Sequence, residues 1–350
     1  MKKTVLTGDR PSGNLHIGHY VGSLRRRVEM QNSNQYEMYI LVADLQALTD
    51  NADNPKKIRD SITQVMLDYL AVGLDPAHVH FVLQSSVPAL FELPLYYANL
   101  VTQARLERNP TVKAEIKQKK FDKSVPVGFV FYPISQAADI TAFGADFVPV
   151  GADQAPMLEQ TREIVETFNR IYGKGEKILT MPTALIPDGK ESRLVGIDGN
   201  GKMSKSLDNC IYIKDTAKQL HEKVMAMYTD PDHIHVTDPG KIEGNVVFTY
   251  LDAFCNDAHF TRHLPEYKNL DELKKHYRKG GLGDVKIKKF LYAILDELLT
   301  PMRERRATYE QNLTLVHEYL RKGTAAAVTK SNEILRTVRA AIGIYSFGGG

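Results

Sequence analysis

The stretch "TVLTGDRPSGNLHIGH", residues 4–19, joins a short β-rich run to a loop in which His16 and His19 flank Gly18. Further β-rich runs follow, namely "MYILVA", "VHFVLQ" and "DFVPVG", and they alternate up to about residue 190 with longer segments of helical period. This alternation predicts βαβ units and a parallel sheet. The fold class expected for the first half is therefore α/β, a Rossmann-like doubly wound domain.

After about residue 208 the strand signals fade, and helical period dominates in "TAKQLHEKVMAMY", "NVVFTYLDAFC" and "VKIKKFLYAILDELLTPMRERRATYEQN". We predict a catalytic domain over residues 1–208, a helical domain over 209–343 and a tail over 344–350. For the final helix, near 320–343, packing back on the first domain is the alternative arrangement.

Composition and charge place the chain among soluble globular proteins. Its 350 residues are 43% hydrophobic and 25% charged, with a formal net charge of +3. A charge this small does not indicate nucleic-acid binding, so an RNA contact is expected only from local basic patches. The two cysteines, Cys210 and Cys255, lie far apart and outside zinc-ligand spacing, which favours a reducing, cytoplasmic location. We expect no signal peptide and no membrane partner, because no apolar segment is long enough.

The loop after the first strand has the position and composition of a phosphate-binding loop. Ligands of open parallel sheets bind outside the carboxyl ends of the strands. The loop lacks GxGxxG and the Walker lysine, so it is neither a dinucleotide fingerprint nor a P-loop. Gly13 and Gly18 allow close backbone approach, and His16 and His19 can donate hydrogen bonds to phosphate oxygens. Such donors stabilise charge that develops in a transition state.

A second loop, "GKMSKS" at residues 201–206, carries two cations. Lys202 and Lys205 stand beside the hydroxyls of Ser204 and Ser206, and glycines precede them. This composition suits a loop that closes on a triphosphate. Either motif alone would usually be a surface turn, but the two together indicate a nucleotide site.

With "HIGH" at 16–19 and "KMSKS" at 202–206, the chain resembles the class I aminoacyl-tRNA synthetases, and residues 1 to about 340 are similar to the tryptophanyl family. The resemblance implies that L-tryptophan reacts with ATP to give an adenylate, which is then transferred to tRNA(Trp), with Mg²⁺ assisting. The substrate carboxylate is itself the nucleophile, so catalysis consists of positioning and charge stabilisation. The catalytic residues implied are His16, His19, Lys202 and Lys205.

The resemblance also implies binding residues and partners. A homodimer is expected, with residues 96–113 in its interface, and the helical domain is expected to read the tRNA anticodon. The residues implied to line ATP are Arg10, Pro11, Ser12, Gly18, His19, Gly151, Ala152, Asp153, Leu194, Lys202, Met203, Ser204, Lys205 and Ser206.

Amino-acid specificity depends on "FYPISQAADITAFGADFVPVGADQ", residues 131–154. Read as a helix, it places Tyr132, Gln136 and Asp139 on one face at i, i+4 and i+7. A carboxylate inside an apolar helix needs a partner; a helix cap or a salt bridge is the alternative to a substrate. The resemblance implies that Asp139 accepts the indole N–H. The tryptophan-binding residues implied are Leu6, Gln46, Tyr132, Gln136, Asp139, Val148, Val150 and Gln154.

Two other functions stay open at this point. Tyrosyl enzymes use a similar Tyr, Gln and Asp arrangement, but they place a phenol on the first strand where this chain has Leu6. A nucleotidyltransferase with an HxGH loop would act on a small molecule, and the full KMSKS argues against it. Leu6, Gln46 and Gln136 together resemble the auxiliary, second bacterial type of tryptophanyl enzyme. The lysine-rich segment 113–126 is either a solvated insertion or a contact to RNA or substrate.

Overall fold

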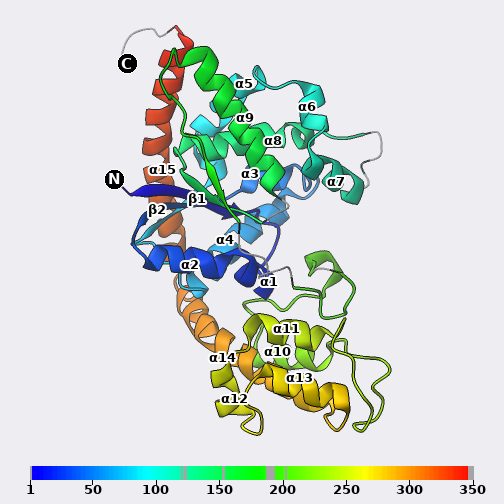
Figure 1. Cartoon of the computed structure of the whole chain (residues 1–350). Coiled ribbons are helices and arrows are strands. Elements are labelled where there is room, and N and C mark those ends of the chain that lie inside the picture. Colours follow the sequence, from blue (N-terminus) through cyan, green and yellow to red (C-terminus); the bar gives the residue numbers. More distant parts are fainter. Residues whose placement is uncertain are drawn as a thin grey trace.

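The sheet has the predicted parallel, doubly wound architecture. The computed structural model describes residues 2–119, 121, 124–151, 154–186, 194–201 and 203–345. Within them all neighbouring strands pair in parallel, in the order β3-β2-β1-β4-β5 (Figure 1). The strand order reverses between β1 and β4, and the edge above that point is where such sheets bind ligands. The strands are β1 (Lys3–Asp9), β2 (Tyr36–Val42), β3 (Val79–Leu83), β4 (Phe147–Pro149) and β5 (Thr183–Leu185).

Helices cover both faces of the sheet because successive side chains of each strand point in opposite directions. Val5 of β1 belongs to the core cluster that contains α4 side chains, and Leu6 to the cluster that contains α5, α8 and α15 side chains. The helices of this part are α1 (Ile17–His19), α2 (Arg25–Asn32), α3 (Asp44–Leu48), α4 (Pro55–Ala71), α5 (Ala89–Ala98), α6 (Gln103–Glu107), α7 (Pro110–Lys119), α8 (Val127–Ala142) and α9 (Ala155–Tyr172). Short helical turns span Tyr20–Leu24, Gln84–Ser86 and Lys205–Leu207.

Local sequence signals set several of these boundaries. The side chain of Asn54 caps α4, Pro55 is its first residue, and Gly73 follows its end with a φ of 102°. The four predicted strands are present. The edge strand β5 was not predicted, because its three residues carry too short a pattern to stand out.

The helical region lies at the other end of the molecule and is joined to the sheet part by α14 (Figure 1). No helix among the described ranges is both long and apolar enough to cross a membrane. The helices after residue 208 are α10 (Ala217–Met225), α11 (Val246–Phe254), α12 (Asp257–His263), α13 (Leu270–Lys279), α14 (Asp284–Glu310) and α15 (Leu313–Ile342).

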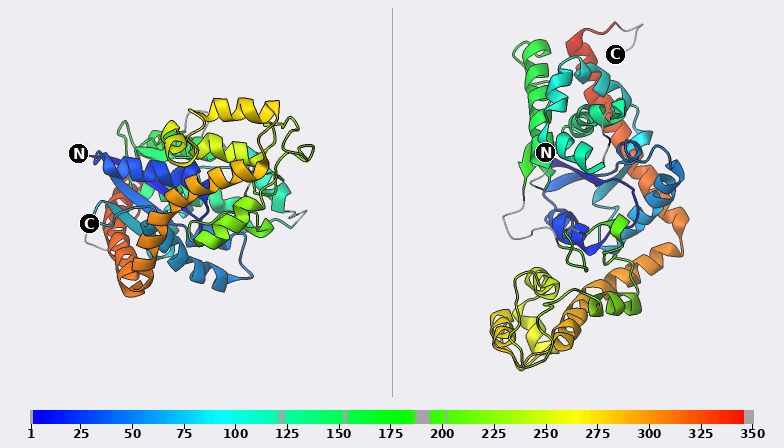
Figure 2. Two further views of the ribbon diagram at one scale, coloured as in Figure 1. Left: turned by 90° about the horizontal axis from the view of Figure 1, so that it is seen from below. Right: turned by 90° about the vertical axis from the view of Figure 1, so that its right-hand side faces the viewer.

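The last helix, α15, runs back along the sheet part (Figure 2). At Gly323 it approaches β3 so closely that a Cβ would lie 2.2 Å from the carbonyl oxygen of Phe81. The hydroxyl of Thr324 accepts the backbone N–H of Leu83 at 3.0 Å. The final helix thus packs on the sheet part. It begins at Leu313, earlier than the start near residue 320 that the sequence pattern suggested.

Candidate active site

The loop after β1 begins at a buried ion pair, at the point in the sheet where the strand order reverses. The carboxylate of Asp9 accepts hydrogen bonds from Arg27 at 2.6 Å and from the Tyr69 hydroxyl at 2.8 Å. Burial alone would raise the pKa of Asp9, but the charges of Arg27 and His19 and these hydrogen bonds outweigh it and lower the pKa to about 2. Asp9 is therefore ionised at pH 7 and holds the start of the loop.

The two histidines of the loop lie against each other. Their ring centroids are 3.8 Å apart, and the backbone N–H of His16 donates to Nδ1 of His19 at 3.1 Å. Burial is the largest cause that lowers the pKa of His16 to about 2 and that of His19 to about 4. Both rings are therefore neutral at pH 7, and each has one N–H to donate. Nδ1 of His16 is buried and has no hydrogen-bond partner among the described residues.

The HIGH motif (residues 16–19) and the KMSKS motif (residues 202–206) are far apart in the sequence but meet in space. Nζ of Lys205 donates to the carbonyl oxygen of Gly13 at 3.0 Å. Met203 lies over the HIGH turn, because a Cβ placed on Gly18 would be 3.2 Å from its sulfur. Backbone hydrogen bonds from Ile17 to Ile211 and from Ile213 to Leu15 join the same two segments at 3.0 and 3.1 Å.

The HIGH loop is also tied to the helical region. The backbone N–H of Leu15 donates to Asp68 of α4 at 2.7 Å, and the other carboxylate oxygen accepts from Arg306 of α14. Both acidic and basic side chains are almost fully buried. Burial raises the pKa of Asp68 to about 6, although Arg306 and the Leu15 N–H oppose that rise. The pair therefore connects α14 to the loop that carries the histidines.

Replacing Arg306 by methionine is expected to destabilise the folded protein by about 3–5 kcal/mol, because Asp68 would stay buried without its partner. Urea unfolding at pH 7.5 measures this loss. The matched control is Arg321→Met, which removes an exposed partner of Glu318 and is expected to leave the unfolding midpoint unchanged. Equal shifts for the two variants would contradict the importance of the buried pair.

The face of α8 that the sequence singled out is buried and polar. Asp139 is 4% exposed, and both of its carboxylate oxygens accept hydrogen bonds from Nε2 of Gln84, at 2.9 and 2.8 Å. Tyr132 is also buried and donates its hydroxyl proton to Glu115 at 2.8 Å. Oε1 of Gln136 is buried with no partner among the described residues. Asp139 thus caps no helix and has an amide, not a cation, as its hydrogen-bond partner.

Burial is the largest cause that raises the pKa of Asp139, and the charge of Asp44 adds to it. The hydrogen bonds from Gln84 act in the opposite direction, and the resulting pKa is about 7. A carboxylate that costs this much to bury is more typical of a functional site than of a structural one.

Three of the other predicted pocket residues, Leu6, Val148 and Val150, pack with side chains of this helix. Leu6 and Val148 are buried in one core cluster with α8 side chains, and Val150 packs against that cluster. Gln46, in α3, donates its backbone N–H to Gln84 at 3.1 Å. Gln154 is the residue just before α9. The β1 side chains alternate between faces, which is why Leu6 and not Val5 lies on the α8 side.

The predicted ATP-lining residues occupy the sheet edge and the two loops. Arg10 pairs with Asp50 at 3.4 Å, Pro11 is buried, and Ser12 and Gly151 are at least partly accessible. Leu194 is buried, and its carbonyl oxygen accepts the N–H of Met203 at 3.4 Å; the N–H of Ser204 donates to Asn209. Ala152, Asp153 and Lys202 lie outside the described residues, as does the side chain of Ser206.

The lysine-rich segment 113–126 is not simply a solvated insertion. Its first part belongs to α7, and Glu115 there binds Tyr132. Phe121 packs edge-on against Phe129 of α8, with ring centroids 4.9 Å apart. Glu115 and Phe121 of this segment therefore contact α8.

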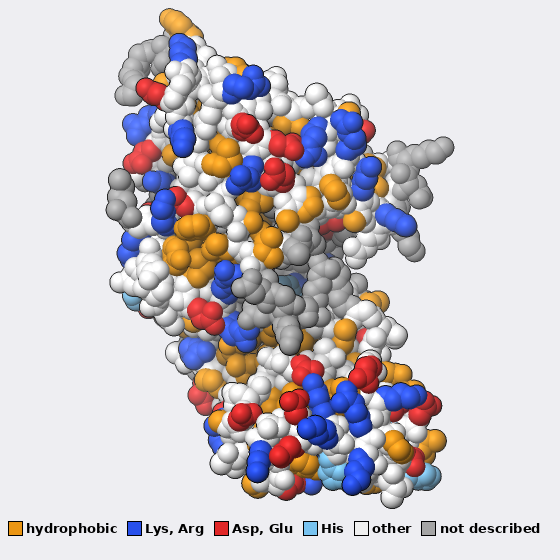
Figure 3. All heavy atoms as spheres, viewed as in Figure 1, with side chains coloured by type: hydrophobic (Ala, Val, Ile, Leu, Met, Phe, Trp, Pro, Cys, Tyr) orange, Lys and Arg blue, Asp and Glu red, His pale blue; other side chains and the backbone are white. Residues whose placement is uncertain are grey.

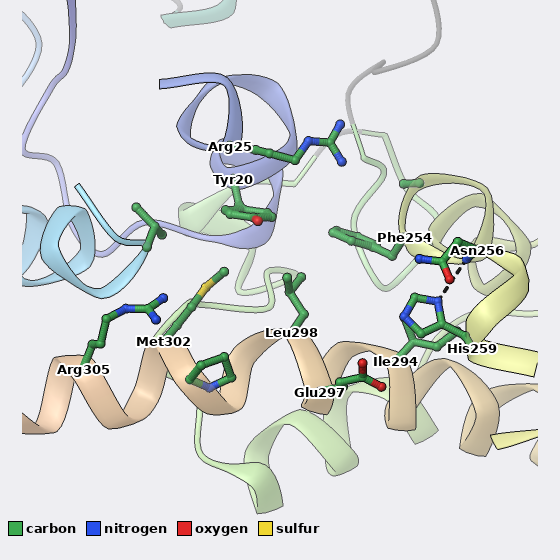
Figure 4. A pocket seen from close by; sticks show the side chains of 13 residues that line it. Tyr20, Arg25, Phe254, Asn256, His259, Ile294, Glu297, Leu298, Met302 and Arg305 are labelled. Atoms are coloured by element: carbon green, nitrogen blue, oxygen red, sulfur yellow. Dashed lines mark hydrogen bonds between the residues drawn. The ribbon is translucent and has the colours of Figure 1, made fainter. Parts of the chain in front are cut away.

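A cavity of about 440 Å³ lies elsewhere, between the turn that follows the HIGH motif and helices α11, α12 and α14 (Figure 4). Tyr20, Phe254 and Leu298 point into it, and Glu297 lies at its edge. Glu297 is already bound by Arg262 and His263, the last two residues of α12. His259, another lining residue, is 8% exposed and accepts the N–H of Asn256. Across the described ranges, no three His, Cys, Asp or Glu side chains cluster as a metal site.

Comparison with known proteins agrees with this geometry. The family model "tRNA synthetases class I (W and Y)" matches residues 2–300. A tryptophan–tRNA ligase of Clostridium longisporum is 56% identical over 346 residues, covering 99% of this chain and 98% of that protein. One of Lactococcus lactis is 54% identical over 349 residues, covering 99% of each.

A solved structure gives the same result for the fold. Tryptophanyl-tRNA synthetase from Campylobacter jejuni, complexed with ADP and tryptophan, is 29% identical and superimposes with a TM-score of 0.80 over 97% of this chain and 100% of that one. The chain therefore belongs to the class I tRNA synthetases, within the family of tryptophan–tRNA ligases.

Proposed function

We propose that this enzyme activates L-tryptophan with ATP and transfers it to tRNA(Trp). In the first step a tryptophan carboxylate oxygen attacks the α-phosphorus, the bond to the β-phosphate oxygen breaks, and tryptophanyl-adenylate and pyrophosphate form. In the second step a ribose hydroxyl of the terminal adenosine takes the aminoacyl group and AMP leaves. The observations that carry the proposal are the buried Asp139 on the α8 face and the contact that joins the two loops proposed to bind phosphate.

The two loops supply the chemistry of the first step. His16 and His19, neutral at pH 7, donate hydrogen bonds to phosphate oxygens, and Lys205 supplies a positive charge where pyrophosphate leaves. Lys202 is proposed to share that role. The charged and aromatic side chains in the described part of the loops are imidazoles and an ammonium, and the Asp9 carboxylate, the type of ligand that Mg²⁺ prefers, is already taken by Arg27. We therefore place Mg²⁺ on the ATP phosphates, with no protein residue assigned to hold it.

Tryptophan is proposed to lie between Leu6 of β1 and the α8 face, with its indole N–H donated to Asp139. Leu6 offers a substrate phenol no polar partner at its own position on β1, which argues against tyrosine. A site built for a substrate N–H can reject analogues without it by about 10⁴–10⁵. Leu6, Gln46 and Gln136 remain the basis for assigning the pocket to the auxiliary bacterial type.

The test of the proposed function is amino-acid-dependent ATP–pyrophosphate exchange with tryptophan and tyrosine in parallel, followed by tRNA charging. Exchange with tryptophan alone is expected. Exchange with tyrosine would show that the pocket has been misassigned, and exchange with neither would contradict the activity.

Replacing Gly18 by alanine is expected to raise the KM for ATP about 10-fold or more. The new Cβ would lie 2.8 Å from Nδ1 of His16 and 3.2 Å from the sulfur of Met203, so both motifs would have to shift. Steady-state exchange kinetics measure the effect. Gly22→Ala, where a Cβ would meet nothing within 4 Å, is the control, and equal KM values for the two variants would contradict the argument.

The partners are proposed from the family. We place the enzyme in the cytoplasm and assign the anticodon to the helical domain, residues 209–343. On the face shown in Figure 3, Lys and Arg side chains gather over the helical region with Asp and Glu side chains among them. Contact with RNA would therefore rely on individual cations and not on a uniformly basic surface.

A homodimer is proposed through the segment 96–113 and the part of α5 that precedes it. Phe91 and Leu95 of α5 are 52% and 63% exposed, which is unusual for large apolar side chains. Tyr97, in contrast, is fully buried and bonded to Thr141, so it supports the interface only from within. Analytical ultracentrifugation measures the mass of the assembly.

A further inference from the structure

Gln84 lies at the end of β3 and links the α8 face of the predicted tryptophan pocket to α3. It follows β3 directly, at the carboxyl edge of the sheet, and it is 2% exposed. Its Nε2 donates to both carboxylate oxygens of Asp139, at 2.9 and 2.8 Å. Its Oε1 accepts the backbone N–H of Gln46 at 3.1 Å, which fixes the orientation of the amide. The amide therefore presents a donor, and only a donor, to the carboxylate.

The surroundings of Asp139 make this donor important. The carboxylate is buried, and the charged group that faces it is Asp44 of α3, which itself accepts the N–H of Ser85. A like charge and a low dielectric both favour the protonated acid. A protonated carboxyl would compete poorly for an indole N–H, because one of its oxygens has become a donor.

We propose that Gln84 is a positioning residue for tryptophan specificity: it keeps the Asp139 carboxylate ionised and oriented so that a free lone pair accepts the indole N–H. The inference rests on the proposed function and adds to it a residue that neither motif contains. Gln84 acts through Asp139 and need not touch the substrate. Its removal should therefore affect substrates according to whether they carry the N–H.

The experiment compares tryptophan with 3-(benzothiophen-3-yl)alanine, in which sulfur replaces the indole N–H, in ATP–pyrophosphate exchange between pH 6 and pH 9. Gln84→Met is expected to lower kcat/KM for tryptophan by about 10- to 100-fold, as typical for loss of a hydrogen bond to a charged group. The value for the sulfur analogue should change much less. The midpoint of the pH dependence of the tryptophan KM should move to higher pH.

Two further variants separate the role from a general defect. Gln31→Met removes another buried amide, which bridges Gly73 and Asp75 away from the pocket, and it should leave discrimination unchanged. Gln84→Glu keeps an acceptor for the Gln46 N–H but loses the amide donor, and it should reproduce the loss of discrimination if Gln84→Met fails to fold. Equal losses for both substrates would overturn the role of Gln84 and leave the proposed function unaffected. Absence of exchange with tryptophan in the unsubstituted protein would overturn the proposed function as well.

Discussion

Replacing Lys205 by alanine is expected to lower kcat for tryptophan-dependent ATP–pyrophosphate exchange by about 10²- to 10³-fold. The ammonium group contacts the carbonyl oxygen of Gly13 at 3.0 Å, inside the loop that ends at the HIGH turn. Burial lowers the pKa of Lys205, and the charges of Asp9 and Asp68 oppose that change. A buried cation stabilises a phosphate that gains negative charge more strongly than the same cation does in water, because the local dielectric constant is lower.

The effect should be specific for chemistry and for this lysine. Steady-state kinetics should show the loss in kcat, with the KM for tryptophan nearly unchanged, because the role proposed for Lys205 is on the phosphate side of the site. Lys218→Ala, on the exposed face of α10, serves as the matched control and should retain full activity. A loss confined to the KM for tryptophan would place Lys205 elsewhere.

The fold was predictable where the sequence carries local signals. The β-rich runs of β1 and β2 and the punctuation of α4 by Pro55 and Gly73 depend on neighbouring residues, and the structure confirms these elements. The packing of α15 on β3 was only an option in the sequence. It depends on the close approach of Gly323 to the backbone of Phe81, a contact between distant segments that no local sequence pattern predicts.

The same distinction applies to the site. The histidine and lysine motifs were recognisable because the residues proposed to act together lie within a few positions of one another. Asp9, Asp68 and Gln84 were missed, since each owes its role to partners far along the chain: Arg27 for Asp9, Arg306 for Asp68. The one available signal for Gln84 was its place at the end of a strand, the edge where such sheets bind ligands. That signal indicates the region of the fold in which Gln84 lies but not what the residue does there.

Asp139→Asn is expected to lower kcat/KM for tryptophan by about 10²- to 10³-fold, because a neutral amide is a weaker acceptor for the indole N–H than a carboxylate. The amide must also turn its oxygen toward Gln84, so its nitrogen takes the place of one acceptor. Exchange kinetics at pH 8 measure the loss. Retained discrimination against 3-(benzothiophen-3-yl)alanine would contradict the role of Asp139.

The same substitution should stabilise the folded protein at alkaline pH. The pKa of Asp139 is raised from 3.8 to about 7, so the folded state binds the proton more tightly than the unfolded state. Its stability is then fully present below pH 3.8 and falls as the pH rises to 7, by about 4 kcal/mol in total. Asparagine lacks this titration, so the variant should gain on the wild type between pH 5.5 and pH 8.0 in urea unfolding.

The control for this pH effect is Asp60→Asn, which neutralises an exposed carboxylate of α4 and should show no such gain. A stability difference between Asp139→Asn and the wild type that does not depend on pH would show that Asp139 titrates normally in the folded protein. If the gain is observed together with the loss of tryptophan activation, the buried carboxylate is kept at a cost to stability, which is the behaviour of a residue retained for substrate binding.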